Sequence, residues 1–432
     1  MRSDQQQAIN RLAGTSATAF LCAVLCVYPL YIDKFSNLGV TKFTGCFTLF
    51  LLFLLWLVAC TAIGARAPRS RNANAGRDVT LWGVLAFAGT SLISTFTSLS
   101  PTASTWGLGG YYGGLMLVLF TAAGYWAVRS YLDLENLDFV FWVLGITTSI
   151  VAVLYVLNIF NIDLIGAYAD TAVVERAQFF STLGQKDFNG CFFSVALPIV
   201  FYQFLNAKDT RTAVWTGIPA AFGALALAVV DSEALALGIG AAVLVLVCHK
   251  NFTTRHLRRA ALIGAAFFGW AAWMHYMRAS VYTQGGTALL AKLGAWQVAL
   301  PCMAASLLLW LVLFVLARKG IAAQAPLYLP GRVITIAVLA VGALAFVLAN
   351  AMPNLPLPES LHNLLVFNDD WGTYRGVAWR AAFGTWADGS LLRKIVGIGP
   401  GMMHTAVAAW AGDAMTARMA TFYAAHNEYL EQ

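Results

Sequence analysis

The sequence predicts an all-α polytopic membrane protein, and three observations lead to this fold class. Of the 432 residues, 59% are hydrophobic and only 11% are charged, and the mean hydropathy is +0.70. A soluble domain normally carries about 25% charged residues, because polar groups must cover its surface. The apolar residues also gather in segments close to the roughly 20 residues that one helix needs to cross the hydrocarbon core of a bilayer.

Eleven of these segments are predicted to be membrane-spanning helices. Hydrocarbon offers no hydrogen-bond partners, so the backbone of each segment must satisfy its own polar groups by becoming helical. The predicted spans are, in chain order, residues 15–33, 43–65, 79–98, 110–129, 138–160, 187–206, 212–230, 233–249, 259–276, 295–317 and 331–352. We therefore expect a transmembrane bundle over residues 1–352, followed by a more polar helical loop over residues 353–432.

The positions of the basic residues predict the orientation of the helices. The net charge is +7, but Lys and Arg occur in short clusters between apolar segments, which is typical of a topology signal rather than of nucleic-acid binding. With the N-terminus in the cytoplasm, the inner connections carry 16 Lys and Arg residues and the outer connections carry six. The odd number of spans then places residues 353–432 outside the cytoplasm. We expect membrane lipids, and not nucleic acid, to surround the chain.

An Arg/Trp-rich run is the first candidate for chemistry in this loop. Trp371, Arg375 and Trp379 recur every four residues and so share one helix face, with Arg380 adjacent. Such a face is typical of an interfacial anchor. Alternatively, the two guanidinium groups bind the phosphates of a lipid-linked substrate, because their planar donors match phosphate oxygens. The glycine turn at 397–401 can bring backbone N–H groups together as anion-binding nests do.

A histidine near the end of the sequence is the second candidate. His426 lies in a helix-forming stretch beside Asn427 and several aromatic residues. A neutral imidazole, with an ordinary pKa of about 6.5, can take a proton from an acceptor hydroxyl. The alternative is an interfacial histidine that caps the neighbouring helix.

No metal site is predicted. The seven cysteines lie in or at the ends of apolar segments, without the CxxC or Cys/His spacing that zinc requires. Asp369 and Asp370 are adjacent, but two acids alone make a poor site for a divalent cation.

Polar residues also open the sixth predicted helix, in the run Gly184-Gln185-Lys186-Asp187-Phe188-Asn189-Gly190. Polar groups at the entrance of an apolar helix need partners or a ligand, so Lys186 and Asn189 are candidate cavity residues. Asp231 and Glu233 lie in the very short connection between the seventh and eighth spans. These acids are either functional groups at the membrane edge or part of a tight turn at the water interface.

Four stretches of the chain resemble a known family. Residues 181–190 look like the G-x-x-N stretch of the O-antigen ligase and O-antigen polymerase superfamily. Residues 375–380, 396–401 and 426–430 are similar, in order and spacing, to the large outer loop of that family. The resemblance extends over most of the chain, and the outer-loop trio is its specific part.

The resemblance implies a GT-C-like fold and a metal-independent glycosyltransferase, without cofactor, in the bacterial inner membrane. Such enzymes move a glycan from an undecaprenyl diphosphate carrier to a hydroxyl of an acceptor glycan or glycolipid. By position, His426 is then the catalytic base and Arg375 and Arg380 are the diphosphate clamp. Lys186, Asn189 and Asn427 are the remaining substrate-binding residues implied. Relatives continue into further spanning helices, so we expect a twelfth helix to be missing after Gln432.

Two other functions fit a chain of many apolar helices. One is a transporter or flippase for lipid-linked polysaccharide, although such proteins usually contain two related halves, which this sequence does not show. The other is a non-catalytic component of envelope assembly that presents its outer loop to partner proteins. Movement of the substrate without covalent transfer would identify the transporter. Arg375 and His426 substitutions that leave the chemistry unchanged would identify the assembly component.

Overall fold

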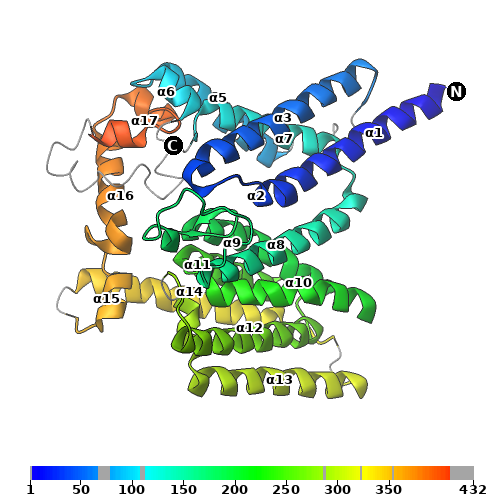
Figure 1. Cartoon of the computed structure of the whole chain (residues 1–432), viewed down its shortest axis with the longest axis vertical. Coiled ribbons are helices and arrows are strands. Elements are labelled where there is room, and N and C mark those ends of the chain that lie inside the picture. The colour runs from blue at the N-terminus through cyan, green and yellow to red at the C-terminus, as the bar shows by residue number, and fades with distance from the viewer. Residues whose placement is uncertain are drawn as a thin grey trace. The chain divides into compact units, whose positions relative to one another are not determined.

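The computed structural model describes residues 2–66, 78–107, 112–285, 289–321, 324–352 and 355–408. Its principal helices and strands are α1 (Arg2–Cys22), α2 (Tyr28–Leu30), α3 (Leu38–Ala62), α5 (Val79–Phe96), α6 (Pro101–Trp106), α7 (Leu115–Tyr131), α8 (Leu137–Ile159), β1 (Phe179–Phe180), β2 (Gly184–Gln185), α9 (Lys186–Asn206), α10 (Thr210–Val229), α11 (Glu233–Cys248), α12 (Thr254–Ser280), α13 (Trp296–Arg318), α14 (Tyr328–Ala351), α15 (Glu359–Leu365), α16 (Trp371–Ala387) and α17 (Leu391–Val396). Figure 1 shows their arrangement.

A helix lies at each of the eleven predicted positions, which confirms an all-α polytopic architecture. Eight helical stretches among the described residues are long and apolar enough to cross a membrane. Of the other three helices, α7 and α11 have 17 and 16 residues. The third, α12, has 27 residues, but its first turns carry several arginines. The number of crossings and the GT-C-like arrangement therefore remain predictions.

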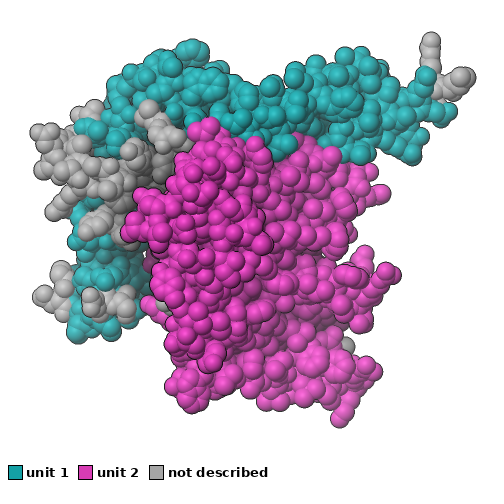
Figure 2. Space-filling model, viewed as in Figure 1, with its two compact units in different colours: residues 1–17, 43–132, 339–432 teal, residues 18–42, 133–338 magenta. Residues whose placement is uncertain are grey.

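The chain divides into two compact units, coloured separately in Figure 2. Unit 1 contains residues 1–17, 43–132 and 339–432, and unit 2 contains residues 18–42 and 133–338. The sequence predicts a separate loop after Met352. In the structure, the described residues of this segment belong to unit 1, together with helices from the N-terminal part of the chain.

Within unit 1, polar contacts join helices that are distant in sequence. Asp78 caps the start of α5 by accepting from the backbone N–H of Leu81, and it also forms an ion pair with Arg129 at the end of α7. The indole of Trp56 donates to the Ser16 hydroxyl at 2.8 Å. In the C-terminal part, the described residues 403–408 pack on α16 through a small core that contains Met403 and Ala378.

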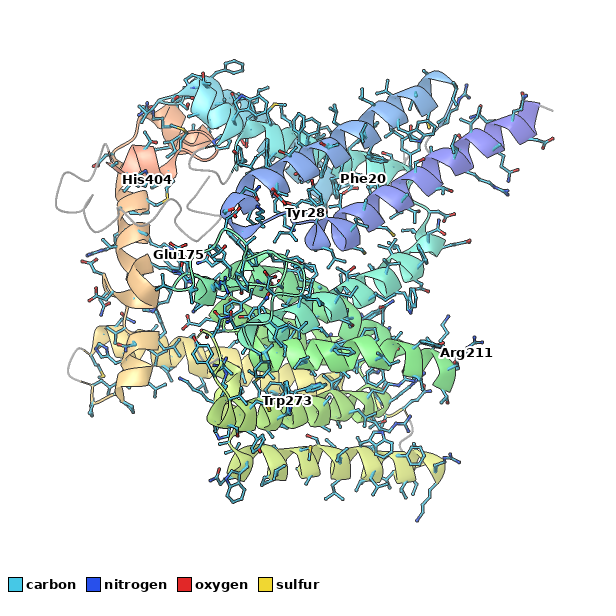
Figure 3. The ribbon with its side chains drawn as sticks, in the orientation of Figure 1. Phe20, Tyr28, Glu175, Arg211, Trp273 and His404 are labelled. Atoms are coloured by element: carbon cyan, nitrogen blue, oxygen red, sulfur yellow. The ribbon has the colours of Figure 1, made fainter. Side chains whose placement is uncertain are left out.

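Unit 2 is a layered bundle in which α10 packs against α8, α9 and α12, and α12 packs along α13. Its core includes Tyr155, Phe193 and Leu197, each at most 1% exposed. Figure 3 labels Arg211 in the first turn of α10 and Glu175 in a loop near the other end of that bundle. The two short strands of this unit are a feature that the all-α prediction did not anticipate.

The first predicted span is one helical stretch from Asp4 to Leu30 that contains a π-helical turn. After α1 the chain forms a π-helical turn at Ala23–Val27, and α2 contains Pro29 and ends at Leu30. The carbonyls of Tyr28 and Pro29 accept hydrogen bonds from the Lys42 ammonium group at 3.1 and 3.0 Å. The end of a helix has few intrahelical donors, and Lys42 adds its donors to the Tyr31 N–H on the Tyr28 carbonyl and the Thr182 hydroxyl on the Pro29 carbonyl.

The end of α9 is completed in the same way by an arginine of α12. Arg259 is 9% exposed, and its guanidinium donates to the carbonyls of Phe204, Leu205 and Ala207 at 3.1, 2.9 and 2.6 Å. A cation at a helix C-terminus also interacts favourably with the helix dipole.

We expect the substitution Arg259→Ala to lower the free energy of unfolding by about 2 kcal/mol, because buried carbonyls lose charge-assisted donors. The measurement is thermal or denaturant unfolding of the purified protein in detergent. Lys250→Ala, at an exposed position before α12, is the control and should leave stability unchanged. Equal stability of the two variants would contradict the capping role.

Candidate functional site

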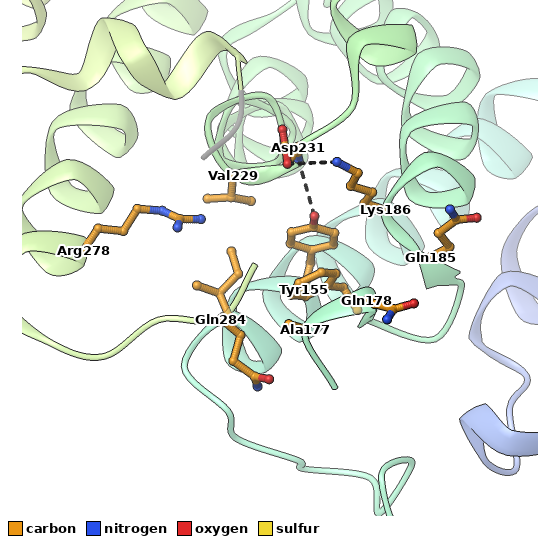
Figure 4. Close-up of a pocket in the computed structure, with 11 residues that line it drawn as sticks. Tyr155, Ala177, Gln178, Gln185, Lys186, Val229, Asp231, Arg278 and Gln284 are labelled. Atoms are coloured by element: carbon orange, nitrogen blue, oxygen red, sulfur yellow. Dashed lines mark hydrogen bonds and ion pairs between the residues drawn. The ribbon is translucent and has the colours of Figure 1, made fainter. Parts of the chain in front are cut away.

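Unit 2 contains a cavity of about 250 Å³ where α8, α10 and α12 end and α9 and α11 begin. Figure 4 shows that Lys186 and Arg278 enter it from opposite sides, with Tyr155 and Asp231 between them. Its polar lining consists of Tyr155, Gln178, Gln185, Lys186, Asp231, Arg278 and Gln284. The volume is near the lower limit of about 300 Å³ for small-molecule sites, so a compact head group fits better than a whole glycan.

A short hairpin forms one wall of the cavity. Strand β1 pairs with β2 in antiparallel register, with Phe180 opposite Gly184. The turn between them needs a left-handed residue at Ser181, with φ of 55°, and Gly184 has φ of 83°. Phe180 stacks on the Tyr155 ring at a centroid distance of 4.7 Å, which fixes the hairpin against α8.

Asn189 holds this hairpin in place. Its amide nitrogen lies 3.0 to 3.2 Å from the carbonyls of Phe180, Gly184 and Gln185. Its amide oxygen accepts from the Ser181 hydroxyl at 2.6 Å. The side chain is fully buried and does not line the cavity, so its role in the structure is to position Gln185 and Lys186.

Gly190, in the first turns of α9, allows the short connection before α11 to approach this helix closely. A Cβ atom at this position would overlap the Ser232 side chain, which is in the short connection before α11. The Ser232 hydroxyl also lies 3.1 Å from the Asp187 carboxylate and donates to it. These contacts hold the connection that carries Asp231 close to the first turn of α9.

Lys186 and Asp231 form an ion pair across the cavity at 3.1 Å. The backbone N–H of Asp231 also points to the Tyr155 hydroxyl at 3.4 Å. The Lys186 and Asp231 side chains are 45% and 25% exposed, and pairs this accessible contribute at most about 1 kcal/mol. An incoming anion can therefore compete with Asp231 for the ammonium group.

Arg278 brings the second cation from the last turn of α12. The chain after this helix is fastened to the end of α8, because the Gln284 backbone N–H donates to the Ile159 carbonyl at 2.7 Å. The Gln284 amide, 4% exposed, donates to the Asn158 carbonyl and to the Asn161 side chain, both at 3.0 Å. The ends of α8 and α12 are thus tied together beside the cavity.

The loop between α8 and β1 is also ordered by polar contacts. Both oxygens of Asp163 accept backbone N–H groups, from Ala167 and Tyr168, at 2.9 Å. The Tyr168 hydroxyl donates to the Phe179 carbonyl. Burial raises the pKa of this tyrosine well above its ordinary value, so it stays a neutral donor at physiological pH.

The charges make this cavity suited to an anion. Lys186 and Arg278 face a single carboxylate, which leaves one positive charge in excess among the cavity residues. Arginine and lysine are the residues that most often bind phosphate, and the Gln178 and Gln185 side chains add neutral donors. The described residues contain no group of three His, Cys, Asp or Glu side chains that could hold a metal ion.

The remaining predicted site residues lie in unit 1 or outside the described residues. The spacing of Trp371 and Trp379 correctly predicted one helix face, since both lie on α16 with ring centroids 5.1 Å apart. Arg380 forms an ion pair with Asp369. Arg375 lies on α16 beside Gly372. His426 and Asn427 lie outside the described residues, so the predicted base remains untested.

Backbone conformation and close packing explain why glycines occur in the turn at 397–401. Gly397, Gly399 and Gly401 have φ of 86°, 104° and 69°, which other residues rarely adopt. A Cβ atom on Gly399 would lie 2.6 Å from the Ser104 hydroxyl and 2.8 Å from Cβ of Ser98. The turn therefore lies directly against the segment that follows α5.

Sequence reasoning identified Lys186 but missed Tyr155 and Arg278 as cavity residues. Arg278 was counted only as one of six cations in the outer connections. An arginine two residues before the end of a helix, after a long and mostly apolar stretch, was an available signal. The sequence contains no such signal for Tyr155, because an aromatic residue inside an apolar span is usually part of the core.

We expect the Lys186→Ala and Arg278→Ala substitutions each to weaken binding of inorganic pyrophosphate about tenfold, because each removes a charge-assisted hydrogen bond of about 1.5 kcal/mol. Asp231→Asn should strengthen binding, because it removes the competing carboxylate. Titration of the purified protein at constant ionic strength measures these changes. Lys292→Ala, at an exposed position after α12, is the control, and an effect as large as that of Arg278→Ala would disprove a specific site.

No protein-family model, no curated protein and no solved structure matches the chain. The cavity of unit 2 supplies two cations at the ends of apolar helices.

Proposed function

We propose that the protein is a glycosyltransferase of the bacterial inner membrane that moves a glycan from undecaprenyl diphosphate to an acceptor hydroxyl. The observation that supports this most is the cationic cavity of unit 2. Its residues occupy the helix ends that the distribution of Lys and Arg assigns to the extracytoplasmic side. A lipid-linked diphosphate has the matching chemistry, since its apolar tail belongs in the bilayer and its head group needs cations.

In this proposal Lys186 and Arg278 bind diphosphate oxygens. Anion binding draws Lys186 away from Asp231, and the amides of Gln178 and Gln185 solvate the remaining oxygens. Negative charge grows on the diphosphate as its bond to the sugar breaks, so fixed cations stabilise the transition state more than the bound substrate. Arg375 and Arg380 are the additional phosphate-binding groups that the family resemblance implies.

The transfer itself forms one bond and breaks one. The acceptor hydroxyl oxygen attacks the anomeric carbon of the donor sugar, and the bond from that carbon to the diphosphate oxygen breaks, with inversion. His426 takes the hydroxyl proton, and undecaprenyl diphosphate leaves with the bonding electron pair. Asn427, next to His426, is the proposed neighbour that orients the acceptor.

The substitution His426→Ala is expected to abolish glycan transfer in reconstituted membranes while the amount of folded protein stays unchanged. The physical reason is that no other group in the proposal accepts the acceptor proton. Product formation is followed with a labelled lipid-linked glycan. His362→Ala, on the exposed helix α15, serves as the control and should keep full activity.

Three outcomes of the same assay separate the alternatives. Full transfer by the His426→Ala protein would remove the proposed base. Movement of the labelled lipid across the membrane without covalent transfer would identify a transporter. Neither transfer nor movement in the wild-type protein, with intact binding of partner proteins, would identify an assembly component.

A further inference from the structure

The hairpin formed by the end of α16 and by α17, residues 383–396, carries an unusual apolar surface. Leu391 and Ile395 are 76% and 69% exposed, and Phe383, Leu392 and Trp386 are 59%, 49% and 48% exposed. Water-exposed apolar surface of this kind costs about 25 cal/mol per Å². A cluster of large apolar side chains on a segment predicted to lie outside the spans therefore points to a partner surface.

The other face of the same helix is already occupied. Trp371 and Trp379 pack on Phe367, at centroid distances of 5.6 and 6.3 Å. Val377 and Ala378, at most 1% exposed, belong to the small core with Met403. The exposed apolar residues of the 383–396 hairpin are therefore not part of this core.

The position of α17 indicates which partner the apolar surface meets. Helix α17 packs against α5, which is a candidate membrane span that ends at Phe96. The turn after α17 lies against Ser98 and Ser104, just beyond that end. Phe96 and Leu99 are themselves 75% and 50% exposed. The apolar surface is therefore on a helix that packs against a candidate spanning helix, whose end also exposes apolar side chains.

Two cations accompany the apolar residues. Arg393 and Lys394 lie between Leu392 and Ile395 in the sequence, and the Lys394 ammonium is 6.0 Å from the Trp386 ring centroid. The Trp386 indole donates to the Lys394 carbonyl at 3.1 Å. Tryptophan with neighbouring lysine or arginine is typical of the boundary between head groups and acyl chains, where the ring is half-buried and the cation reaches phosphate.

We propose that the 383–396 hairpin is an interfacial anchor in the leaflet at which α5 ends. Leu391, Leu392 and Ile395 enter the acyl region, and Arg393 and Lys394 bind lipid head-group phosphates. The anchor fixes the depth of the segment that carries Arg375 and Arg380. It does not depend on the proposed transfer reaction, because the lipid bilayer is its only ligand.

Spin labels on single cysteines test the insertion in phosphatidylcholine vesicles with 30% phosphatidylglycerol, a composition chosen at roughly physiological anionic content. The labels are placed by Leu391→Cys and Ile395→Cys in full-length protein whose native cysteines are replaced. Asp388→Cys, in the exposed turn before α17, is the matched control. We expect oxygen, but not a water-soluble nickel complex, to relax the labels at 391 and 395, and the reverse at 388. Labels at 391 and 395 that respond like 388 would overturn the proposal.

Hydrogen exchange in protein that keeps its native cysteines tests the cations independently. The double substitution Arg393→Glu and Lys394→Glu should increase exchange of residues 383–396 at least fivefold in the same vesicles. The double substitution to Gln should have a smaller effect, and detergent micelles without phosphate groups should remove the difference. Unchanged exchange in the Glu variant would refute the phosphate contact, whatever the activity of the protein.

Discussion

The structure depends on the side chains that donate hydrogen bonds to the backbone carbonyls at buried helix ends. A helix that stops within an apolar bundle leaves several carbonyls without donors, and each such group is costly in hydrocarbon. Unit 2 meets this requirement with long side chains from other elements. Lys42 supplies donors to the end of α2, Arg259 to the end of α9, and Gln284 to the end of α8.

The candidate site is a product of the same requirement. A chain segment whose side chains donate hydrogen bonds to the carbonyls at a helix end must lie close to that end. Such segments therefore bring further polar residues to the same end of the bundle. The hairpin before α9 is fixed by Asn189, and the chain after α12 is fixed by Gln284. Between these two fastened segments lies a cavity with Lys186 and Arg278 on its sides. The segments that carry or flank the two cations are thus fixed by bonds of Asn189 and Gln284, which is a good basis for a preorganised site.

Much of the fold could be predicted from the sequence, because apolar segments of spanning length have few alternatives to the helix. The eleven predicted spans each contain a helix, although the first helical stretch begins earlier than expected and contains a π-helical turn before it ends at Leu30. The cavity was less predictable, since its residues come from five segments spread between Tyr155 and Gln284. Periodicity indicates which residues share a helix but not which helix ends meet. Asn189 illustrates this limit: its position suggested a ligand, whereas its hydrogen bonds are to the backbone and the Ser181 hydroxyl of the neighbouring hairpin.

The close approach of α9 and the connection before α11 depends on one missing methyl group. Gly190 sits where α9 touches the connection that carries Ser232 and Asp231. Any larger residue there would push that connection outward and lengthen the distance between the carboxylate and the Lys186 ammonium. An uncharged position one helical turn away from the lysine consequently controls how strongly the cavity's own acid competes with an incoming anion.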